Sequence, residues 1–323
     1  MVYTSPSVNK NSVDKFNGKF KGKDILSIDQ FSPKDLETVF SLAKKMKKMV
    51  SKHEPTRTLS GYVIGLIFFE PSTRTFSSFA SAAKRLGAGT VEHQNPLEVS
   101  SVAKGETLED TMKILEANTE AIVIRHPEVG SAARAASSVD VPVINAGDGP
   151  NQHPTQTLLD LLTIKEHMGR LSKLKIAFVG DPLHYRTFHG QFSALSQYPG
   201  NHFYGISPKG LEMPKEYRNK DYHDVVIDMK NLDKTLADLK PDIISVGRVP
   251  KEYIKGDPKR YKFVINAKTL KGLPKKSIII HPLPRIDEMT TEVDDDPRAV
   301  YFKYQVRNGL YIRMALLKLI LGR

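Results

Sequence analysis

The chain has 323 residues, with 48 Lys and Arg against 36 Asp and Glu, which gives a formal net charge of +12. At roughly 100–200 residues per domain, this length predicts two domains with full cores. The lack of cysteine excludes disulfide scaffolds, thiolate metal sites, iron–sulfur clusters and a cysteine nucleophile. No apolar stretch approaches the roughly 18–20 residues of a membrane-spanning helix. We therefore expect a water-soluble globular protein without a membrane partner, and the lack of cysteine fits a reducing, cytoplasmic location.

The basic excess is typical of proteins that bind nucleic acids or small anions. The lysines are spread along the chain, with acidic residues among them in several stretches. No RGG, zinc-finger or aromatic-interleaved RNA-binding motif is present in the sequence. We therefore expect most lysines to form a solvated surface, and we expect no nucleic-acid partner.

The first 20 residues are rich in Ser, Asn and Lys and lack apolar periodicity, which predicts a disordered N-terminal tail over residues 1–20. Beyond it, apolar runs of strand length alternate with stretches of helical spacing. We expect strands at Tyr62–Phe69, Ala121–Ile124, Val141–Ile144, Lys175–Gly180, His202–Ile206, Asp242–Val246, Phe263–Ile265 and Ser277–Ile280. Helical spacing follows Ser32, Ser72, Thr107 and Pro154, and a last helix carries Leu310, Met314, Leu317 and Leu321.

Strands that lack polar alternation and are separated by helices are typical of parallel sheets covered on both faces. The chain therefore predicts an α/β fold of two doubly wound parallel-sheet domains, with a boundary near Gly169–Lys173. Open sheets of this kind bind ligands beyond the carboxyl ends of their strands. The loops that follow the strands are therefore the first places to search for a site.

The strongest local signal is the segment Phe69–Thr75, FEPSTRT, which joins a strand to a helix. Ser72 is a natural N-cap, so the amides of the next residues have no partner within the helix. Free amides, the positive end of the helix dipole, hydroxyls and the Arg74 guanidinium together make an anion site, most naturally for phosphate. A well-capped helix without a ligand is the competing interpretation, and the GxxxxGK pattern of a nucleotide P-loop is missing.

Two further segments carry polar groups at comparable positions. Arg125 follows the strand Ala121–Ile124, where it could contact a ligand or form a surface salt bridge. His153 and Gln156 are three residues apart at a helix start and lie on one helix face. An imidazole and an amide there can hold a carbonyl and a neighbouring NH₂ group, although His153 could instead only cap the helix.

Other loops have weaker signals when each is taken alone. The polar loop Ser100–Thr107 carries Lys104, and His281–Arg285 contains two prolines after a strand and leaves backbone carbonyls exposed. Arg186 and Arg248 follow strands of the second domain and could each grip a carboxylate. A rigid connector or a surface charge is the competing interpretation for each of these.

Taken together, the segments STRT, RHP, HPTQ and HPLPR resemble the aspartate/ornithine carbamoyltransferase family in order and approximate spacing, from about Lys21 to Gly322. The resemblance implies transfer of the carbamoyl group of carbamoyl phosphate to the amine of L-aspartate, which gives N-carbamoyl-L-aspartate and phosphate in pyrimidine biosynthesis. Pro282 stands where the ornithine branch carries a cysteine, which favours the aspartate branch. The family also implies no metal, no cofactor and no covalent enzyme intermediate.

The resemblance further implies a division of the chain and an assembly. A carbamoyl-phosphate-binding domain would cover residues 21–168, with the C-terminal helix 305–323 returning to it, and an aspartate-binding domain would cover residues 169–304. The Ser100–Lys104 segment matches a loop that the family inserts into the neighbouring subunit's site, which implies a homotrimer with shared active sites. Regulatory chains or a dihydroorotase could bind such a trimer.

The family's functional residues fall into two sets. Carbamoyl-phosphate binding is implied for Ser72, Thr73, Arg74, Thr75, Ser100, Lys104, Arg125, His153, Gln156, Pro282 and Leu283. Aspartate binding is implied for Lys104, Arg186, Thr187 and Arg248, and catalytic roles are implied for Arg74, Thr75, Lys104, Arg125 and His153. In this scheme Thr75, Arg125 and His153 polarise the carbamoyl oxygen. The Gln156 amide and carbonyls around Pro282 and Leu283 hold the carbamoyl NH₂.

The sequence departs from the family pattern where the amino acid would bind. Pro250 stands in place of a usual Gln, and Tyr253 stands in place of a later Arg, which is the partner expected for Glu70. Leu183-His184-Tyr185, after Pro182, replaces a small, Lys-containing stretch. The carbamoyl-phosphate half is intact, so a carbamoyltransferase for another amino acid remains open as an alternative.

A catalytically weakened paralogue that acts as an assembly or regulatory partner is a further alternative. In such a protein, Lys104 and Arg248 would be expected to be replaced by other residues, and both are present. The leading expectation is therefore an enzyme that acts on L-aspartate.

Overall fold

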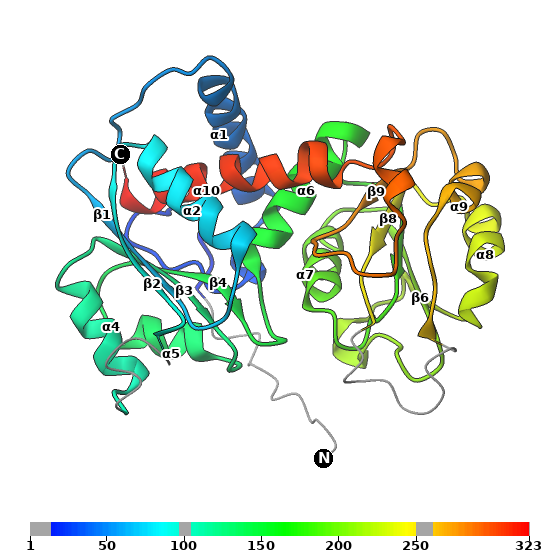
Figure 1. The fold of residues 1–323 in the computed structure, drawn as a ribbon, viewed down its shortest axis with the longest axis horizontal. Coiled ribbons are helices and arrows are strands. Elements are labelled where there is room, and N and C mark those ends of the chain that lie inside the picture. The colour runs from blue at the N-terminus through cyan, green and yellow to red at the C-terminus, as the bar shows by residue number, and fades with distance from the viewer. Residues whose placement is uncertain (1–13, 97–104, 250–260, 323) are drawn as a thin grey trace. The chain divides into compact units, whose positions relative to one another are not determined.

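The computed structural model describes residues 14–96, 105–249 and 261–322. The chain forms two compact units, of which the first comprises Met1–Leu158 with Gly309–Arg323 and the second comprises Leu159–Asn308. Each unit contains one sheet in which all strands are parallel (Figure 1). The predicted α/β fold with two parallel sheets is therefore confirmed. In the described part of the chain, no helix has both the length and the apolar character needed to cross a membrane.

The sheet of the first unit has four strands in the order β2-β1-β3-β4. The strands are β1 (Val63–Phe68), β2 (Gly89–Gln94), β3 (Ala121–His126) and β4 (Val143–Asp148). The helical segments of this unit are η1 (Ile28–Gln30), α1 (Pro33–Ser51), α2 (Thr73–Arg85), α4 (Leu108–Glu116) and α5 (Ser131–Ser137). Apolar side chains of α4 and α5, including Met112 and Ala135, pack with Ile122 and Ile124 of β3 in one core cluster.

The C-terminal helix α10 (Val306–Leu321) returns to the first unit from Gly309 onward. The backbone amide of Gly22 donates to the carbonyl of Ile320 at 2.7 Å. Arg313 is 3% exposed, donates to Thr155 Oγ1 at 3.3 Å and lies over the ring of Phe79. The expectation that the last helix returns to the first domain is confirmed.

The segment from Asp14 to Phe20 differs from the disordered tail expected over residues 1–20. Phe16 is fully buried, and its ring packs at 4.6 Å from those of both Phe20 and Phe31. The amide of Gly18 also donates to the Asp35 carboxylate at 2.8 Å. Two aromatic side chains are enough to fix a polar stretch that lacks periodicity, because each buries a large apolar area. Residues 1–13 lie outside the described residues.

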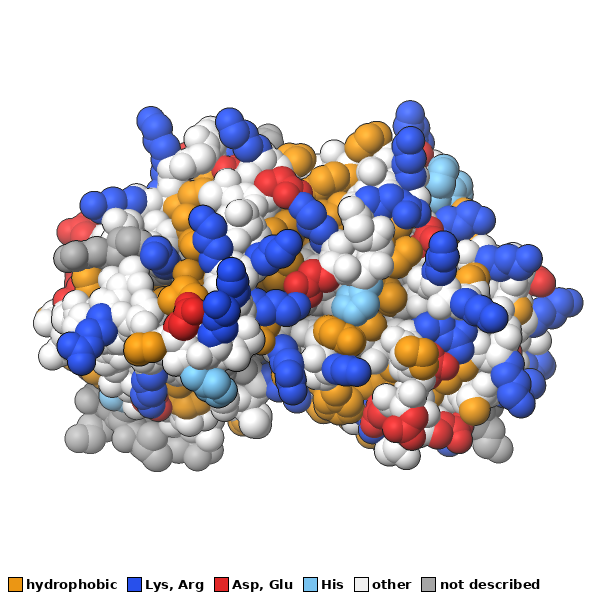
Figure 2. Space-filling model, turned by 90° about the horizontal axis from the view of Figure 1, so that it is seen from above, with side chains coloured by type: hydrophobic (Ala, Val, Ile, Leu, Met, Phe, Trp, Pro, Cys, Tyr) orange, Lys and Arg blue, Asp and Glu red, His pale blue; other side chains and the backbone are white. Residues whose placement is uncertain are grey.

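On the face shown in Figure 2, lysine and arginine side chains are dispersed, with acidic side chains among them. Every described lysine is at least partly exposed. Several cations pair with nearby acids, as in Lys84–Glu92 at 3.1 Å and Arg134–Glu109 at 2.9 Å. Exposed pairs of this kind contribute little to stability. The described lysines agree with the expected solvated surface.

The sheet of the second unit has five strands in the order β7-β6-β5-β8-β9. The strands are β5 (Lys175–Val179), β6 (His202–Ser207), β7 (Tyr222–Val226), β8 (Ile243–Val246) and β9 (Ile278–Ile280). The helical segments are α6 (Pro154–Met168), which begins in the first unit, α7 (Arg186–Leu195), η3 (Lys215–Tyr217), η4 (Met229–Asn231), α8 (Leu232–Leu239), α9 (Ala267–Gly272), η7 (Thr291–Asp295) and η8 (Tyr301–Gln305).

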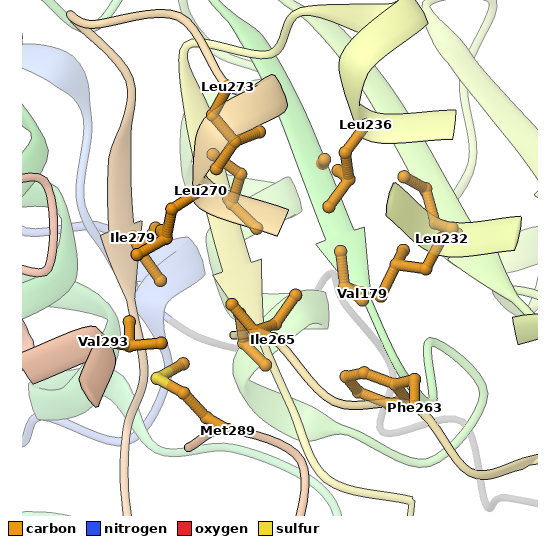
Figure 3. Packing of buried hydrophobic residues seen from close by; sticks show 14 of the residues in the cluster. Val179, Leu232, Leu236, Phe263, Ile265, Leu270, Leu273, Ile279, Met289 and Val293 are labelled. Carbon is orange, nitrogen blue, oxygen red and sulfur yellow. The ribbon is translucent and has the colours of Figure 1, made fainter. Parts of the chain in front are cut away.

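One predicted strand is wrong, and two observed strands were not predicted because they are not continuous apolar runs. Phe263–Ile265 forms only an isolated bridge from Ile265 to Met289. Its apolar character comes from a core position, because Phe263 and Ile265 pack with Val179 (Figure 3). The edge strands β2 and β7 are partly exposed, so their sequences contain polar residues.

Helix α7 packs through aromatic side chains on the sheet of the second unit. The rings of Phe188 and Phe192 lie 5.0 and 4.8 Å from those of Phe178 and Phe203. His189 on the same helix is 5% exposed, stacks on Tyr217 and lies with Nε2 2.8 Å from the Pro182 carbonyl. Burial lowers the pKa of His189 to about 4.

Replacement of Phe16 by Ala tests the packed N-terminal segment. We expect Phe16→Ala to lower the free energy of unfolding by about 3 kcal/mol, because it leaves a cavity among buried rings. Urea denaturation measures the change, and Phe302→Ala serves as the control because Phe302 is 49% exposed. An equal loss in the two variants would contradict the packing of Phe16.

Acid stability tests the buried histidine. The folded-state pKa of His189 lies below its usual 6.5, so on acidification the unfolded chain binds this proton first. Its contribution to stability is therefore complete above pH 6.5 and is lost as the pH falls toward 4. His189→Gln keeps a donor for the Pro182 carbonyl and does not titrate. We expect the loss of unfolding free energy from pH 7 to pH 4.5, measured in urea, to be about 2.5 kcal/mol smaller in this variant; equal losses would refute the assignment.

Candidate functional site

The start of α2 lies directly beyond the carboxyl end of β1 in the first unit. Ser72 occupies the N-cap position, but its hydroxyl makes no capping hydrogen bond. Thr73 and Arg74 are exposed in the first turn, and Thr75 is buried. A helix start whose cap hydroxyl is not used within the helix, next to an exposed guanidinium, is suited to bind an anion.

Two helix starts bring Thr75 and His153 together. Thr75 lies in the first turn of α2, and His153 immediately precedes α6. Thr75 Oγ1 and His153 Nε2 are 3.5 Å apart, and both residues are less than a tenth exposed. Gln156, half-buried one turn later, donates its backbone amide to the His153 carbonyl. A hydroxyl and an imidazole so placed can both donate to one ligand oxygen.

Arg125 lies at the carboxyl end of β3, as expected, and is paired with Glu70. Its Nε lies 3.2 Å from Glu70 Oε2, and its Nη1 lies 3.5 Å from the Ala146 carbonyl. Burial lowers the pKa of Arg125, and the neighbouring Glu70 carboxylate opposes this shift. The guanidinium is therefore held in place and partly desolvated, which strengthens its attraction for an anion. Glu70 has a partner within its own unit despite the substitution at Tyr253.

Asp148 holds the loop that leads to His153, and the sequence search did not single it out. Asp148 is 2% exposed, and its carboxylate accepts from the Asn145 and Asn151 side chains at 2.9 and 2.8 Å. It also accepts from the Gln152 amide at 3.0 Å. The available signal was an Asp at the end of an apolar strand followed by Gly and Pro. Such an Asp can fix a turn through hydrogen bonds to nearby amides.

In the second unit, the carboxyl ends of β5, β8 and β9 lie side by side because these strands are neighbours in the sheet. Arg186 begins α7 after β5, Thr187 follows it and is buried, and Arg248 follows β8. Pro282 and Leu283 follow β9. The sheet order thus brings the residues that are predicted to bind the amino-acid substrate, together with the HPLPR loop, to one edge of one sheet.

The ring of Tyr185 lies against Gly247, the residue that precedes Arg248. Burial raises the pKa of Tyr185, while the charges of Arg248 and Arg186 act in the opposite direction. A Cβ at Gly247 would come within 2.7 Å of the Tyr185 ring, so glycine is needed there. Tyr185, one of the departures from the family pattern, therefore packs beside the backbone that leads to Arg248 and directly precedes Arg186 in the sequence.

His184, another departure, is held by a buried carboxylate. Its Nδ1 lies 2.9 Å from Asp181 Oδ2, and its backbone amide donates to Asp181 Oδ1 at 3.1 Å. The Asp181 side chain is fully buried. The loop before Arg186 is thus fixed by Asp181, and an imidazole stands where the family usually has a lysine-containing stretch.

Some predicted residues cannot be placed. Ser100, Lys104, Pro250 and Tyr253 lie outside the described residues. Within residues 14–96, 105–249 and 261–322, no group of three or more His, Asp or Glu side chains is arranged to hold a metal ion.

Two regions of the chain match family models. Residues 23–166 match "Aspartate/ornithine carbamoyltransferase, carbamoyl-P binding domain", and residues 172–320 match "Aspartate/ornithine carbamoyltransferase, Asp/Orn binding domain". The aspartate carbamoyltransferase catalytic subunit of Thermococcus onnurineus is 42% identical over 312 residues, which are 94% of this chain and 98% of that protein. Aspartate carbamoyltransferase 1, chloroplastic, of Pisum sativum is 40% identical over 308 residues, which are 94% of this chain and 80% of that protein.

Solved structures of aspartate transcarbamoylase from Trypanosoma cruzi are also similar. The complex with carbamoyl phosphate and aspartate is 34% identical, with a TM-score of 0.85 over 94% of this chain and 98% of that one. The complex with N-(phosphonacetyl)-L-aspartic acid is 34% identical, with a TM-score of 0.86 over 94% of this chain and 97% of that one. With both family models matched in order and relatives aligned along nearly its whole length, this chain belongs to the aspartate/ornithine carbamoyltransferase family.

Proposed function

We propose that this protein is an enzyme that transfers the carbamoyl group of carbamoyl phosphate to the α-amine of L-aspartate, giving N-carbamoyl-L-aspartate and phosphate. The observation that carries the proposal is the meeting of Thr75 and His153 at the sheet edge where Arg125 also lies. The ligands of the Trypanosoma cruzi relatives, which are carbamoyl phosphate, aspartate and a phosphonacetyl-aspartate, support the same two substrates.

The proposed chemistry is a direct displacement. The start of α2 and Arg74 bind the phosphate, and Thr75, Arg125 and His153 donate to the carbamoyl oxygen. The neutral α-amine attacks the carbamoyl carbon, so that a C–N bond forms and negative charge grows on this oxygen, where fixed donors stabilise it. The C–O bond to phosphate then breaks, and the phosphate leaves with a proton from the amine. Gln156 and the backbone carbonyls of Pro282 and Leu283 orient the carbamoyl NH₂.

The amino acid is held by its two carboxylates. Arg186, with Thr187, binds the α-carboxylate and Arg248 binds the side-chain carboxylate, with Lys104 as a further contact. Guanidinium groups suit this task because they pair with carboxylates through two parallel hydrogen bonds. Another amino dicarboxylate is the second candidate acceptor, because Leu183-His184-Tyr185 before Arg186 departs from the family pattern.

The assembly and cellular role are also part of the proposal. A homotrimer with shared active sites would use Ser100 and Lys104 of one subunit in the site of its neighbour. The reaction would serve pyrimidine biosynthesis, and regulatory chains or a dihydroorotase are the partners to test. A cytoplasmic location stays a prediction, and the names of the plant relatives place those proteins in the chloroplast.

An acceptor panel with phosphate detection tests the reaction. We expect the purified protein to release phosphate from carbamoyl phosphate only when L-aspartate is present, and not with L-ornithine or L-asparagine. Arg125→Ala should lower kcat by roughly 100-fold or more through loss of an oxyanion donor. Arg134→Ala is the matched control, because Arg134 is a surface residue paired with Glu109 and Glu128. Phosphate release that does not depend on L-aspartate but requires another amine would refute L-aspartate as the acceptor.

Mixing inactive variants tests the shared site. If each site takes Arg74 from one subunit and Lys104 from its neighbour, every trimer that mixes Arg74→Ala and Lys104→Ala chains contains one intact site. Random mixing in equal amounts should then restore about one quarter of wild-type activity. Each variant alone should stay inactive, and mixed trimers verified by mass spectrometry that recover nothing would exclude a shared site.

A further inference from the structure

The loop that follows β9 contains a residue in an uncommon backbone conformation. Leu283, between Pro282 and Pro284, has a φ of 60°. A side chain other than glycine seldom adopts a positive φ, and it persists there only where the surrounding structure fixes it. The question is therefore which groups fix the Leu283 backbone.

The side chain of His281 supplies the first contact. His281 is 1% exposed, and its Nδ1 accepts a hydrogen bond from the backbone amide of Leu283 at 2.8 Å. Because Nδ1 accepts, the proton of a neutral ring lies on Nε2. Nε2 donates to Glu288 Oε1 at 2.7 Å. Both ring nitrogens of His281 are therefore used, and Glu288 selects the tautomer that can hold Leu283.

Glu288 is itself fixed from two directions. It is 3% exposed, and its other oxygen accepts from the amides of Ile286 and Asp287, each at 3.1 Å. Burial acts to raise the pKa of Glu288, but the hydrogen bond from His281 and those from backbone amides hold it below its usual value. Glu288 is therefore an ionised, fully hydrogen-bonded carboxylate that cannot turn away from His281 without a large cost.

The backbone of His281 is anchored as well. Its amide donates to Gln305 Oε1 at 3.0 Å, and Gln305 Nε2 donates to Asp160 Oδ1 at 2.7 Å. Asp160 is fully buried on α6 and also accepts from Gln191 Nε2 at 2.7 Å. This network ties His281 to α6 and α7 of the same unit.

We infer that His281 is a positioning residue, which Glu288 and Gln305 hold so that its Nδ1 fixes the Leu283 backbone and thereby aims the loop carbonyls at the carbamoyl NH₂. The inference rests on the proposed function for the ligand, but the contact from His281 to Leu283 is independent of it. A residue that acts only on the NH₂ should distinguish carbamoyl phosphate from acetyl phosphate, which carries a methyl group in the same place.

Two substitutions separate the ring nitrogens. His281→Asn places a side-chain amide near the position of Nδ1, where its oxygen can still accept the hydrogen bond from the Leu283 amide. His281→Gln places the side-chain amide near the position of Nε2, so that only the contact with Glu288 is kept. His189→Gln is the matched control, because His189 is a second buried histidine of the same unit that contacts a backbone carbonyl. Circular dichroism and urea denaturation verify that the variants are folded.

Hydrogen exchange at the backbone amide of Leu283 tests the conformation of the loop without any ligand. Pro282 and Pro284 have no amide hydrogen, so Leu283 carries the only backbone amide between His281 and Arg285. We expect His281→Gln to speed exchange at Leu283 by roughly tenfold or more, through loss of its acceptor, and His281→Asn to restore much of the protection. Unchanged exchange at Leu283 in His281→Gln overturns the inference, whatever ligand the protein binds.

Calorimetric titration then measures how tightly each variant binds carbamoyl phosphate and acetyl phosphate. We expect His281→Gln to weaken carbamoyl phosphate binding roughly tenfold while acetyl phosphate and inorganic phosphate bind within about twofold of wild type. His281→Asn and His189→Gln should keep the wild-type ratio. Equal weakening for carbamoyl and acetyl phosphate shows a merely structural role and overturns the inference. A wild-type protein that binds neither phosphate ester refutes the proposed function, while the exchange result still decides whether His281 fixes Leu283.

Discussion

A buried carboxylate with several hydrogen-bond donors is the interaction on which the functional loops depend. Asp148 holds the loop before His153, Asp181 holds the loop before Arg186, and Glu288 holds the HPLPR loop through His281. A carboxylate taken out of water is costly unless each oxygen is satisfied, so each one admits very few arrangements of the chain around it. Rigid loops follow, and rigid loops can present donors to a ligand without reorganisation.

The arginines that are proposed to bind the substrates are a small part of the basic excess. The side chain of Arg125 is 17% exposed and is paired with Glu70, whereas most of the described lysines are exposed. Screening by water and salt weakens the exposed charges, while the desolvated guanidinium keeps most of its attraction for an anion. In the proposed site, anion recognition therefore depends on the environment of a few arginines and not on the net charge of +12.

The sequence predicted the fold class and the strand ends and helix starts that carry the described candidate residues, with some physical exceptions. Apolar strands are recognisable because both faces of a parallel sheet are covered, but β2 and β7 lie at edges and contain polar residues. Phe263–Ile265 has the composition of a strand because it fills a core, and Phe16 is buried although its neighbours are polar. The sequence did not point to Asp148 and Glu288, because no fixed sequence spacing marks a carboxylate that positions a loop.

By itself, the sequence determined the alternation of strands and helices, the positions of Arg125, His153, Arg186 and Arg248 at strand ends or helix starts, and the motifs that the family shares. These are local properties, set by periodicity, capping and the order of residues along the chain. Only the tertiary structure decided that Thr75 meets His153, that Glu70 pairs with Arg125 and that the Tyr185 ring packs against Gly247. These contacts join segments that the folded sheets bring together, and their geometry depends on packing and hydrogen bonding that no local pattern encodes.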